Sequence, residues 1–392
     1  MHPLRSVVSR LAERPYWRPL AVFTAIALIA GATVGCGDSV AEETVAPAVL
    51  ATAPAPSVKA AAGILVDRST GRVLWKKNPN QRRAPASLTK VMTAIIVLEK
   101  VRNLDSKCTA PKAVAKDLGN SVGLRPGDRI TVRQALRAAI VKSANDACVT
   151  LAYRVAGSEA AFVRLMNAKA RSLGLDDTQF KNSRGRPVSG HYMSADDLAR
   201  LSRYAMSNAK FRGLCKRQTA VIKWPGHAVR VESHNRLLNY DWADGIKTGA
   251  TSQSGMCLLG SGKYDRRNLI LVTLNQPTRN QEERDAVAMF KWGDAQYEQR
   301  LIISAGDLVT AVPLSGGGEV RAVAMTSLTK TVRRAAQVQV RVSLLAAPPL
   351  GTLPEAGTKL GSVAYKADGQ NLGTVDLVAD GLADPSASPS AL

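Results

Sequence analysis

The stretch Pro85-Ala86-Ser87-Leu88-Thr89-Lys90 stands at the start of an apolar run that continues to about residue 102. Ser87 and Lys90 are three residues apart, so on a helix their side chains share a face within about one turn. A serine hydroxyl is a weak nucleophile until a neighbouring base takes its proton, and an unprotonated lysine amine can be that base. The stretch therefore predicts an activated serine at the start of a buried helix.

The spacing Ser-x-x-Lys is not decisive by itself, because it occurs again at 207–210 and at 327–330. Only the first copy is followed, in order, by the motifs Ser143-Ala144-Asn145 and Lys247-Thr248-Gly249. A second Ser-x-Asn, Ser233-His234-Asn235, lies close before the third motif and ranks lower. Ser143 interrupts two predicted helices, where a side chain can leave a helix end and point into a cleft.

Strand-like and helical stretches alternate around these motifs. Residues 61–75 contain two apolar runs separated by a turn and predict a β-hairpin. Residues 90–210 are predominantly helical and form a lobe inserted after the hairpin, and strand-like runs return from about residue 221. A long helix is predicted at 283–298. We therefore expect an α/β catalytic domain over 59–300, in which the strands of one sheet flank an inserted helical lobe.

The remaining sequence has a different pattern. Short strand-like runs at 320–324, 338–344 and 374–378 are separated by Gly and Pro. They predict a small antiparallel, all-β domain over 301–380. The Ala-, Ser- and Pro-rich stretch 381–392 is expected to be a disordered tail.

With the three motifs in this order, the chain resembles the serine DD-peptidases among the low-molecular-mass penicillin-binding proteins, and more narrowly the D-alanyl-D-alanine carboxypeptidases. The stretches that carry the resemblance are Leu65-Val66-Asp67, Ala86-Ser87-Leu88-Thr89-Lys90, Ser143-Ala144-Asn145-Asp146-Ala147, Asn235-Arg236-Leu237-Leu238 and Asp244-Gly245-Ile246-Lys247-Thr248-Gly249. It covers about residues 60–299 and implies a β-lactamase/DD-peptidase-like catalytic domain, an antiparallel sheet plus an inserted helical lobe, with the small β domain after it. We expect neither a cofactor nor a metal.

The resemblance implies acyl transfer. Ser87 attacks the carbonyl between the two terminal D-alanines of a peptidoglycan stem pentapeptide, and water hydrolyses the acyl-enzyme. Lys90 is implied as the base, its pKa lowered by burial and by the nearby cation Lys247. Ser143 is implied as the relay that carries the proton to the leaving amine.

The substrate-binding residues are implied in the same way. Asn145 binds the peptide amide of the acyl part, and Lys247 and Thr248, followed by Gly249, hold the terminal carboxylate. The backbone N–H groups of Ser87 and Ala250 form the oxyanion hole. The resemblance also implies that penicillins acylate Ser87, because they would occupy the same binding residues.

Two positions depart from the family pattern. Ala250 stands where relatives often carry histidine or tyrosine. Arg184 stands near a position where they often have histidine, and no function is assigned to it.

One alternative function is that of a class A β-lactamase, which needs a glutamate for deacylation. Asn235 occupies the position most similar to that of the glutamate, and Ala144 stands where that class has Asp. A catalytically inactive peptidoglycan-binding scaffold is the other alternative, and the presence of all catalytic residues argues against it.

The N-terminus predicts export. Arginines at positions 5, 10, 14 and 18 precede a charge-free apolar segment, 19–37. Thr33-Val34-Gly35-Cys36 resembles a lipoprotein cleavage site, so residues 1–36 are a signal or lipoprotein segment, or a retained anchor, followed by a flexible tether at 37–58. We expect the body in the periplasm or on the outer face of the cytoplasmic membrane. Because the last residues, Ser388–Leu392, form no amphipathic helix, membrane contact is assigned to the N-terminal segment.

Charge and cysteine content set further limits. The formal net charge is +22, from 53 basic and 31 acidic residues, but the basic residues are scattered and no nucleic-acid-binding module is present. We therefore expect no nucleic-acid partner. Besides Cys36, the chain has Cys108, Cys148, Cys215 and Cys257. They could form two disulfides, in any of three pairings, or remain buried thiols, which we favour.

Overall fold

The computed structural model describes residues 42–43, 54–116, 118–265, 267–314, 318–345 and 354–380. The predicted leader 1–36 with Cys36, most of the predicted tether and the predicted tail 381–392 lie outside the described residues. In the described part of the chain, no helix is both long and apolar enough to cross a bilayer.

Five antiparallel strands form the sheet of the catalytic part, in the order β3-β2-β10-β9-β8. Their bounds are Ala62–Asp67 (β2), Val73–Lys77 (β3), Ala243–Thr251 (β8), Gly255–Tyr264 (β9) and Arg267–Gln276 (β10). The predicted hairpin is β2–β3, and β2 pairs with β10 from far downstream. The predicted antiparallel sheet with a helical lobe inserted between its strands is confirmed.

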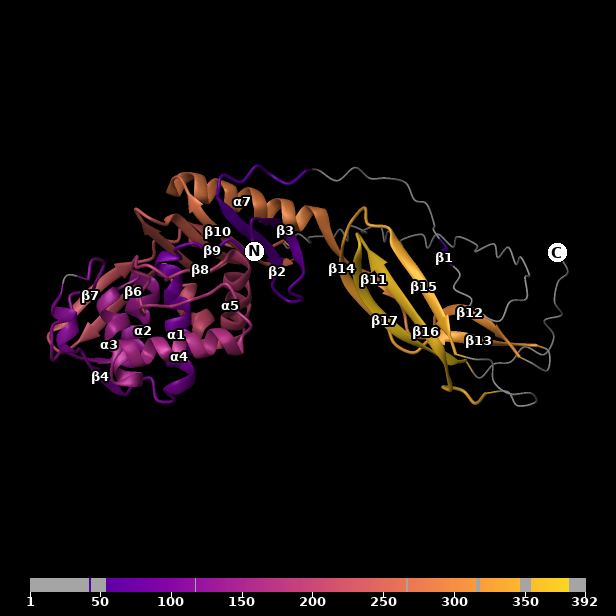
Figure 1. Ribbon diagram of the computed structural model, residues 1–392, viewed down its shortest axis with the longest axis horizontal. Helices are drawn as coiled ribbons and strands as arrows, with labels where there is room; N and C mark the ends of the chain where they lie inside the picture. Colours follow the sequence, from indigo (N-terminus) through magenta and orange to yellow (C-terminus); the bar gives the residue numbers. More distant parts are fainter. Residues whose placement is uncertain are drawn as a thin grey trace, which may run out of the picture. The chain divides into compact units, whose positions relative to one another are not determined.

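Helices cover both faces of this sheet (Figure 1). They are α1 (Lys90–Lys100), α2 (Val132–Arg137), α3 (Asn145–Ala156), α4 (Glu159–Ser172), α5 (Ala195–Ser207), α6 (Ala209–Cys215) and α7 (Arg279–Gln296). α5 packs on β2 and β10, whereas α7 packs on β9 and β10. The helix predicted at 283–298 begins earlier than expected because the side chain of Thr278 accepts the N–H of Gln281 as its N-cap.

Neighbouring residues of the central strands enter two different cores. Ile64 and Val66 belong to the large cluster shared with the helical lobe, which includes Met92 of α1. Leu65 belongs to the cluster shared with α7, which includes Phe290. Successive side chains of a strand point to opposite faces of a sheet. Because both faces are covered, the strand reads in the sequence as an uninterrupted apolar run.

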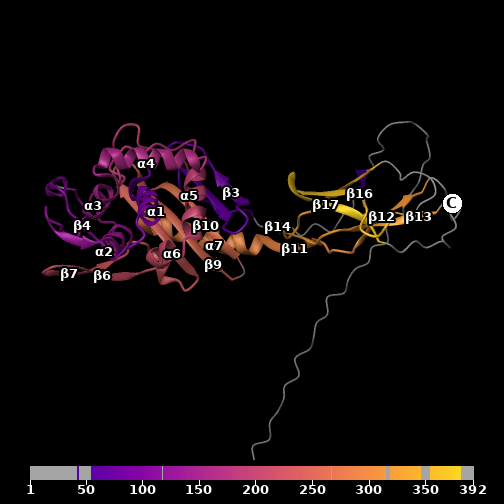
Figure 2. The same cartoon turned by 90° about the horizontal axis from the view of Figure 1, so that it is seen from below.

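Shorter elements complete the lobe. They are η1 (Ala86–Thr89), η2 (Lys112–Ala115), η3 (Ala138–Lys142), η4 (Arg236–Asn239), β4 (Lys107–Thr109), β5 (Arg129–Thr131), β6 (Thr219–Trp224) and β7 (His227–Glu232). β6 and β7 pair as a hairpin at the end of the lobe (Figure 2). η3 is a π-helical turn that ends at Lys142, directly before Ser143, so the second motif stands at a break between helices, as predicted.

The C-terminal part is built of strands alone within the described residues. A six-stranded sheet has the order β1-β15-β16-β17-β13-β12, and β11 pairs with β14. The bounds are Glu42–Glu43 (β1), Tyr297–Ile303 (β11), Leu308–Pro313 (β12), Glu319–Ala324 (β13), Leu328–Arg333 (β14), Val338–Leu344 (β15), Lys359–Ala367 (β16) and Gln370–Ala379 (β17). The three predicted runs are β13, β15 and β17.

Two features of this part differ from the sequence pattern. β11 follows α7 with no intervening loop and lies across the expected domain boundary at residue 300. Glu42–Glu43, inside the predicted tether, pairs with Val340 and Arg341 of β15. An edge strand has unpaired backbone groups that can accept such an addition.

Candidate active site

Ser87 lies in η1, directly before α1, where three segments meet at very close range. A Cβ atom at Gly249 of β8 would stand 2.9 Å from the backbone nitrogen of Ser87. A Cβ atom at Gly185 would stand 1.7 Å from the carbonyl oxygen of Ala86, and the φ of Gly185 is +86°. Glycine is therefore required at both positions for β8 and the 182–187 loop to reach the serine.

Lys90 is completely buried, and its amine touches the serine. Its Nζ lies 2.8 Å from Ser87 Oγ and donates to the carbonyl oxygen of Arg184 at 2.7 Å. Burial, and after it the positive charge of Arg184, lower the pKa of Lys90 to about 8, against the opposing influence of Cys148. The expected lowering by burial is present. Arg184 contributes to it as a cation, and Lys247, the cation that the resemblance implies, is coupled to Lys90 by mutual repulsion.

Lys247 is the second buried lysine of the site. Its Nζ donates to the carbonyl oxygen of Thr248 at 2.9 Å. Burial, and after it repulsion by Lys90, lower the pKa of Lys247 to about 7. Thr248, Gly249 and Ala250, further along β8, face the open pocket, and β8 stands at one end of the strand order.

Ser143 and Asn145 are brought to the same place by backbone geometry. Ser143 has a left-handed φ of +65°, and its side chain is buried at the pocket wall. The N–H of Asn145 donates to the carbonyl oxygen of Asn120 at 2.7 Å, and Asn145 Nδ2 donates to that of Leu118 at 2.6 Å. Asn145 Oδ1 is buried without a hydrogen-bond partner among the described residues.

Asp146, the residue after the second motif, anchors the loop in front of it. Its carboxylate accepts the backbone N–H groups of Val122, Gly123 and Leu124 at 2.9–3.1 Å. Asn120, at the start of that loop, donates to the carbonyl oxygen of Lys142 at 2.7 Å. The loop is therefore tied to both sides of the second motif.

A pocket of about 330 Å³ joins these parts. Its lining comprises Ser87, Asn120, Ser143, Asn145, Arg184, Gly185, Arg186, Pro187, His234, Thr248, Gly249, Ala250, Thr251 and Arg279. The described lining residues include three arginines and no carboxylate, so the pocket suits an anionic ligand. Burial, and after it the positive charges of Lys247, Lys142 and Arg279, lower the pKa of His234.

The three sequence motifs thus converge, and the competing copies do not. Ser207 donates to the carbonyl oxygen of Tyr204 at the end of α5. Ser327 Oγ accepts the N–H of Ala305 in the β-rich part. Sequence reasoning missed Asn120, Asp146, Arg184, His234 and Arg279 as parts of the site. Three of them carried a local signal: Asp146 is adjacent to a motif, His234 lies inside the second Ser-x-Asn, and Arg184 was noted as a departure from the family pattern without a function.

Cys108, Cys148, Cys215 and Cys257 are free and buried, so the thiol interpretation is confirmed for these four. Burial raises the pKa of each thiol, that of Cys148 to about 11, and they stay protonated at neutral pH. In the described residues, no group of three His, Cys, Asp or Glu side chains could hold a metal ion.

Two family models match the chain. One, described as D-alanyl-D-alanine carboxypeptidase, matches residues 49–278, and one, described as penicillin-binding protein 5, C-terminal domain, matches residues 297–381. Among curated proteins, D-alanyl-D-alanine carboxypeptidase DacF of Bacillus subtilis is 32% identical over 80% of this chain and 83% of its own length. DacD of Salmonella typhimurium is 35% identical over 65% of this chain and 67% of its own length.

Solved structures agree with these matches. Penicillin binding protein 5 from Haemophilus influenzae is similar with a TM-score of 0.67 and 27% identity, covering 84% of this chain and 98% of that chain. The Streptomyces K15 DD-transpeptidase is similar with a TM-score of 0.59 and 30% identity, covering 62% of this chain and 100% of that one.

Proposed function

Because the chain belongs to the D-alanyl-D-alanine carboxypeptidase family and is a serine-type cell-wall enzyme of that class, we propose that Ser87 is its nucleophile and Lys90 the base. One observation carries the proposal: the amine of a completely buried lysine lies 2.8 Å from the serine hydroxyl. A lysine whose pKa is lowered to about 8 has a neutral fraction near neutral pH that can accept the hydroxyl proton.

The reaction proceeds by acyl transfer. Ser87 Oγ attacks the carbonyl carbon between the two terminal D-alanines of a stem pentapeptide as Lys90 takes its proton. The proton then passes through Ser143 to the departing amine, the C–N bond breaks, and D-alanine leaves. Water attacks the resulting ester, and its hydrolysis returns a free carboxylate and the Ser87 hydroxyl. A β-lactam acylates the same oxygen by opening its amide ring.

The substrate-binding roles are those that the family resemblance implies, and the composition of the pocket walls supports them. Asn145 binds the peptide amide of the acyl part, with its buried Oδ1 still lacking a protein partner among the described residues. Thr248 and Gly249, at the other wall, and the buried Lys247 hold the terminal carboxylate. The oxyanion lies between the backbone N–H groups of Ser87 and Ala250, and one such donor is worth about 2.7–4 kcal/mol in comparable sites.

The test uses a fluorescent penicillin and a peptide ending in two D-alanines. The full-length protein is compared with Ser87→Ala and with Ser327→Ala, which alters the corresponding serine of the third Ser-x-x-Lys copy. We expect covalent label and D-alanine release from the wild type and Ser327→Ala, and neither from Ser87→Ala. Rapid loss of the label with consumption of penicillin would favour the lactamase alternative. A folded wild-type protein that shows neither covalent label nor D-alanine release would favour the inactive scaffold.

The lactamase alternative also lacks structural support. Class A enzymes place a glutamate beside the acylated serine to activate the deacylating water. No described residue that lines this pocket is an Asp or Glu. The acyl-enzyme formed with a penicillin is therefore expected to persist.

We propose further that the N-terminal segment exports the protein and holds it at the membrane, through lipid on Cys36 or through the retained apolar segment 19–37. The support is the basic stretch followed by an uncharged apolar run. The Cys36→Ala variant separates the two versions. Loss of this variant from the membrane fraction supports anchoring through lipid on Cys36. Its full retention in the membrane fraction supports anchoring through the retained apolar segment.

A further inference from the structure

We propose that Glu159 and Arg184 act together on Lys90, so that this ion pair sets the pH at which Ser87 is acylated. Both are positioning residues: Arg184 acts on the base through its charge and carbonyl oxygen, and Glu159 acts through Arg184. The inference rests on the proposed function of Lys90 as the base. Neither residue belongs to the three sequence motifs.

The loop that carries Arg184 is held rigidly against the serine. Asn182 Oδ1 accepts the N–H groups of Arg184, Gly185 and Arg186 at 2.7–3.2 Å, and Asn182 Nδ2 donates to the carbonyl oxygen of Arg186 at 3.0 Å. The lack of a side chain at Gly185 lets this loop lie directly on Ala86. The carbonyl oxygen of Arg184 is thereby fixed at 2.7 Å from Lys90 Nζ.

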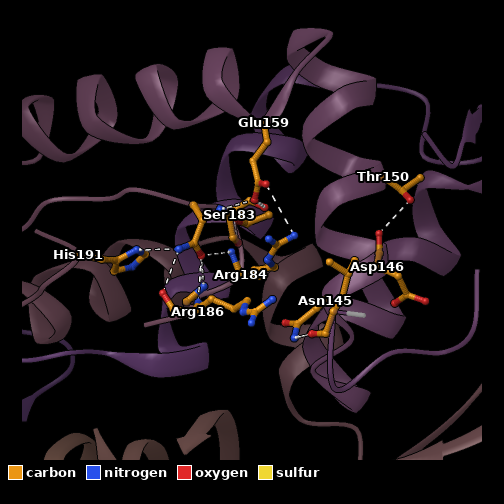
Figure 3. A network of polar contacts seen from close by, with 12 residues as sticks. Asn145, Asp146, Thr150, Glu159, Ser183, Arg184, Arg186 and His191 are labelled. Atoms are coloured by element: carbon orange, nitrogen blue, oxygen red, sulfur yellow. Dashed lines mark hydrogen bonds and ion pairs between the residues drawn. The ribbon is translucent and has the colours of Figure 1, made fainter. Parts of the chain in front are cut away.

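Glu159, at the start of α4, ties the same loop to the helical lobe. Its Oε1 accepts the N–H and the hydroxyl of Ser183 at 3.0 and 2.7 Å. Its Oε2 lies 3.7 Å from Arg184 Nη1, a loose ion pair, and Arg184 Nε is buried without a partner among the described residues. Figure 3 shows Glu159 reaching down to Ser183 and Arg184. The positive charge of Arg184 is thus only partly offset, and it lies at the pocket wall.

The charges around Lys90 come from four elements. Lys247 of β8 repels it, Cys148 of α3 is a neutral thiol at neutral pH, and the loop presents Arg184, with Glu159 of α4 behind it. Charges in such a buried site interact more strongly than in water. Removing the Arg184 charge should therefore favour the ammonium form of Lys90, and removing the Glu159 charge should disfavour it.

The experiment measures the rate constant for acylation by a chromogenic penicillin against pH, with the full-length protein. For Arg184→Gln, the midpoint of the acid limb should move up by about half to one pH unit, and for Glu159→Gln it should move down by about the same amount. Arg184→Lys keeps the charge and should leave the midpoint near that of the wild type. Arg200→Gln removes an exposed arginine, paired with Asp196 on α5, and should not move it.

Opposite shifts are required because a merely structural role would change the rate and not the midpoint. If the midpoints of the acid limbs stay in place, or move in the same direction in both variants, the inference is overturned. Acylation of the wild-type protein would still support the proposed function in that case. A folded wild type that is not acylated at any pH would overturn the proposed function and this inference together. If Arg184→Gln does not fold, Glu159→Gln alone still decides through the sign of its shift.

Discussion

At the scale of single residues, the site depends on two lysines that the fold has removed from water. The exposed fraction of Lys90 is 0% and that of Lys247 is 4%, and the pKa of each is lowered mainly by this burial. Burying an ammonium group is unfavourable unless it is paired, and the neutral amine avoids much of the penalty. Burial of these lysines therefore lowers the stability of the fold, but it also provides a base that works near neutral pH.

The first prediction concerns the base itself. Lys90→Met should reduce the acylation rate constant by about 100- to 10,000-fold, the usual contribution of a general base. Lys330→Met, the matched change in the third Ser-x-x-Lys copy, should leave it unchanged. A Lys90→Met protein that is acylated at more than a tenth of the wild-type rate would exclude Lys90 as the base.

The second prediction concerns stability against pH. The folded-state pKa of Lys90 is about 8, below the ordinary 10.5, so between these values the unfolded chain binds more protons than the folded one. Stability contributed by this group therefore rises with pH through that window and is lower below it. The stability advantage of Lys90→Met over the wild type should shrink from pH 7 to pH 10, measured by denaturant unfolding, and an advantage that grows would contradict the assignment.

At the scale of elements, close packing of η1, β8 and the 182–187 loop creates the site. Gly185→Ala would place a methyl group on the carbonyl oxygen of Ala86. We expect loss of acylation and a destabilisation well beyond the roughly 1–2 kcal/mol of a left-handed non-glycine residue. Gly226→Ala is the control, since its φ is +75° and nothing lies within 4 Å. Equal effects of the two changes on unfolding and acylation would count against the close approach.

The loop before the second motif is the other element to test. Asp146→Ala removes the acceptor of four backbone N–H groups, three in this loop and that of Ala147, and should lower the free energy of unfolding by about 2–4 kcal/mol. It should also slow acylation, because Asn120 and Asn145 are held through that loop. Asp128→Ala, which removes the acceptor of one backbone N–H, that of Arg125, should cost about 1 kcal/mol at most and leave acylation intact.

At the scale of the whole molecule, every described residue that lines the pocket lies between Ser87 and Arg279. Tyr297, just after α7, still belongs to the core shared with β2 and α7, and its hydroxyl donates to the carbonyl oxygen of Leu74 at 2.9 Å. A chain ending at residue 298 should therefore keep its acylation rate constant within about twofold of the full-length value. A larger loss in a folded truncated protein would mean that the β-rich part contributes to catalysis.

The sequence alone determined the nucleophile candidate, the order of the three motifs, a sheet with an inserted helical lobe, and the β-rich end, whereas the antiparallel order of that sheet came with the family resemblance. These are local signals: side-chain spacing within one helical turn, apolar periodicity, and helix breaks such as that at Ser143. Strands β11, β12, β14 and β16 were not recognised individually. β11 has no turn signal before it, because it continues directly from α7.

Only the tertiary structure decided which charges face the base and which residues complete the pocket. Arg184 lies 94 positions from Lys90 along the chain, yet its carbonyl oxygen meets the lysine because Gly185 and Asn182 fix the loop there. Arg279 reaches the pocket from the start of α7. No local pattern encodes such contacts, since they arise when distant segments are packed together, and burial, which lowers both lysine pKa values, is itself a property of that packing.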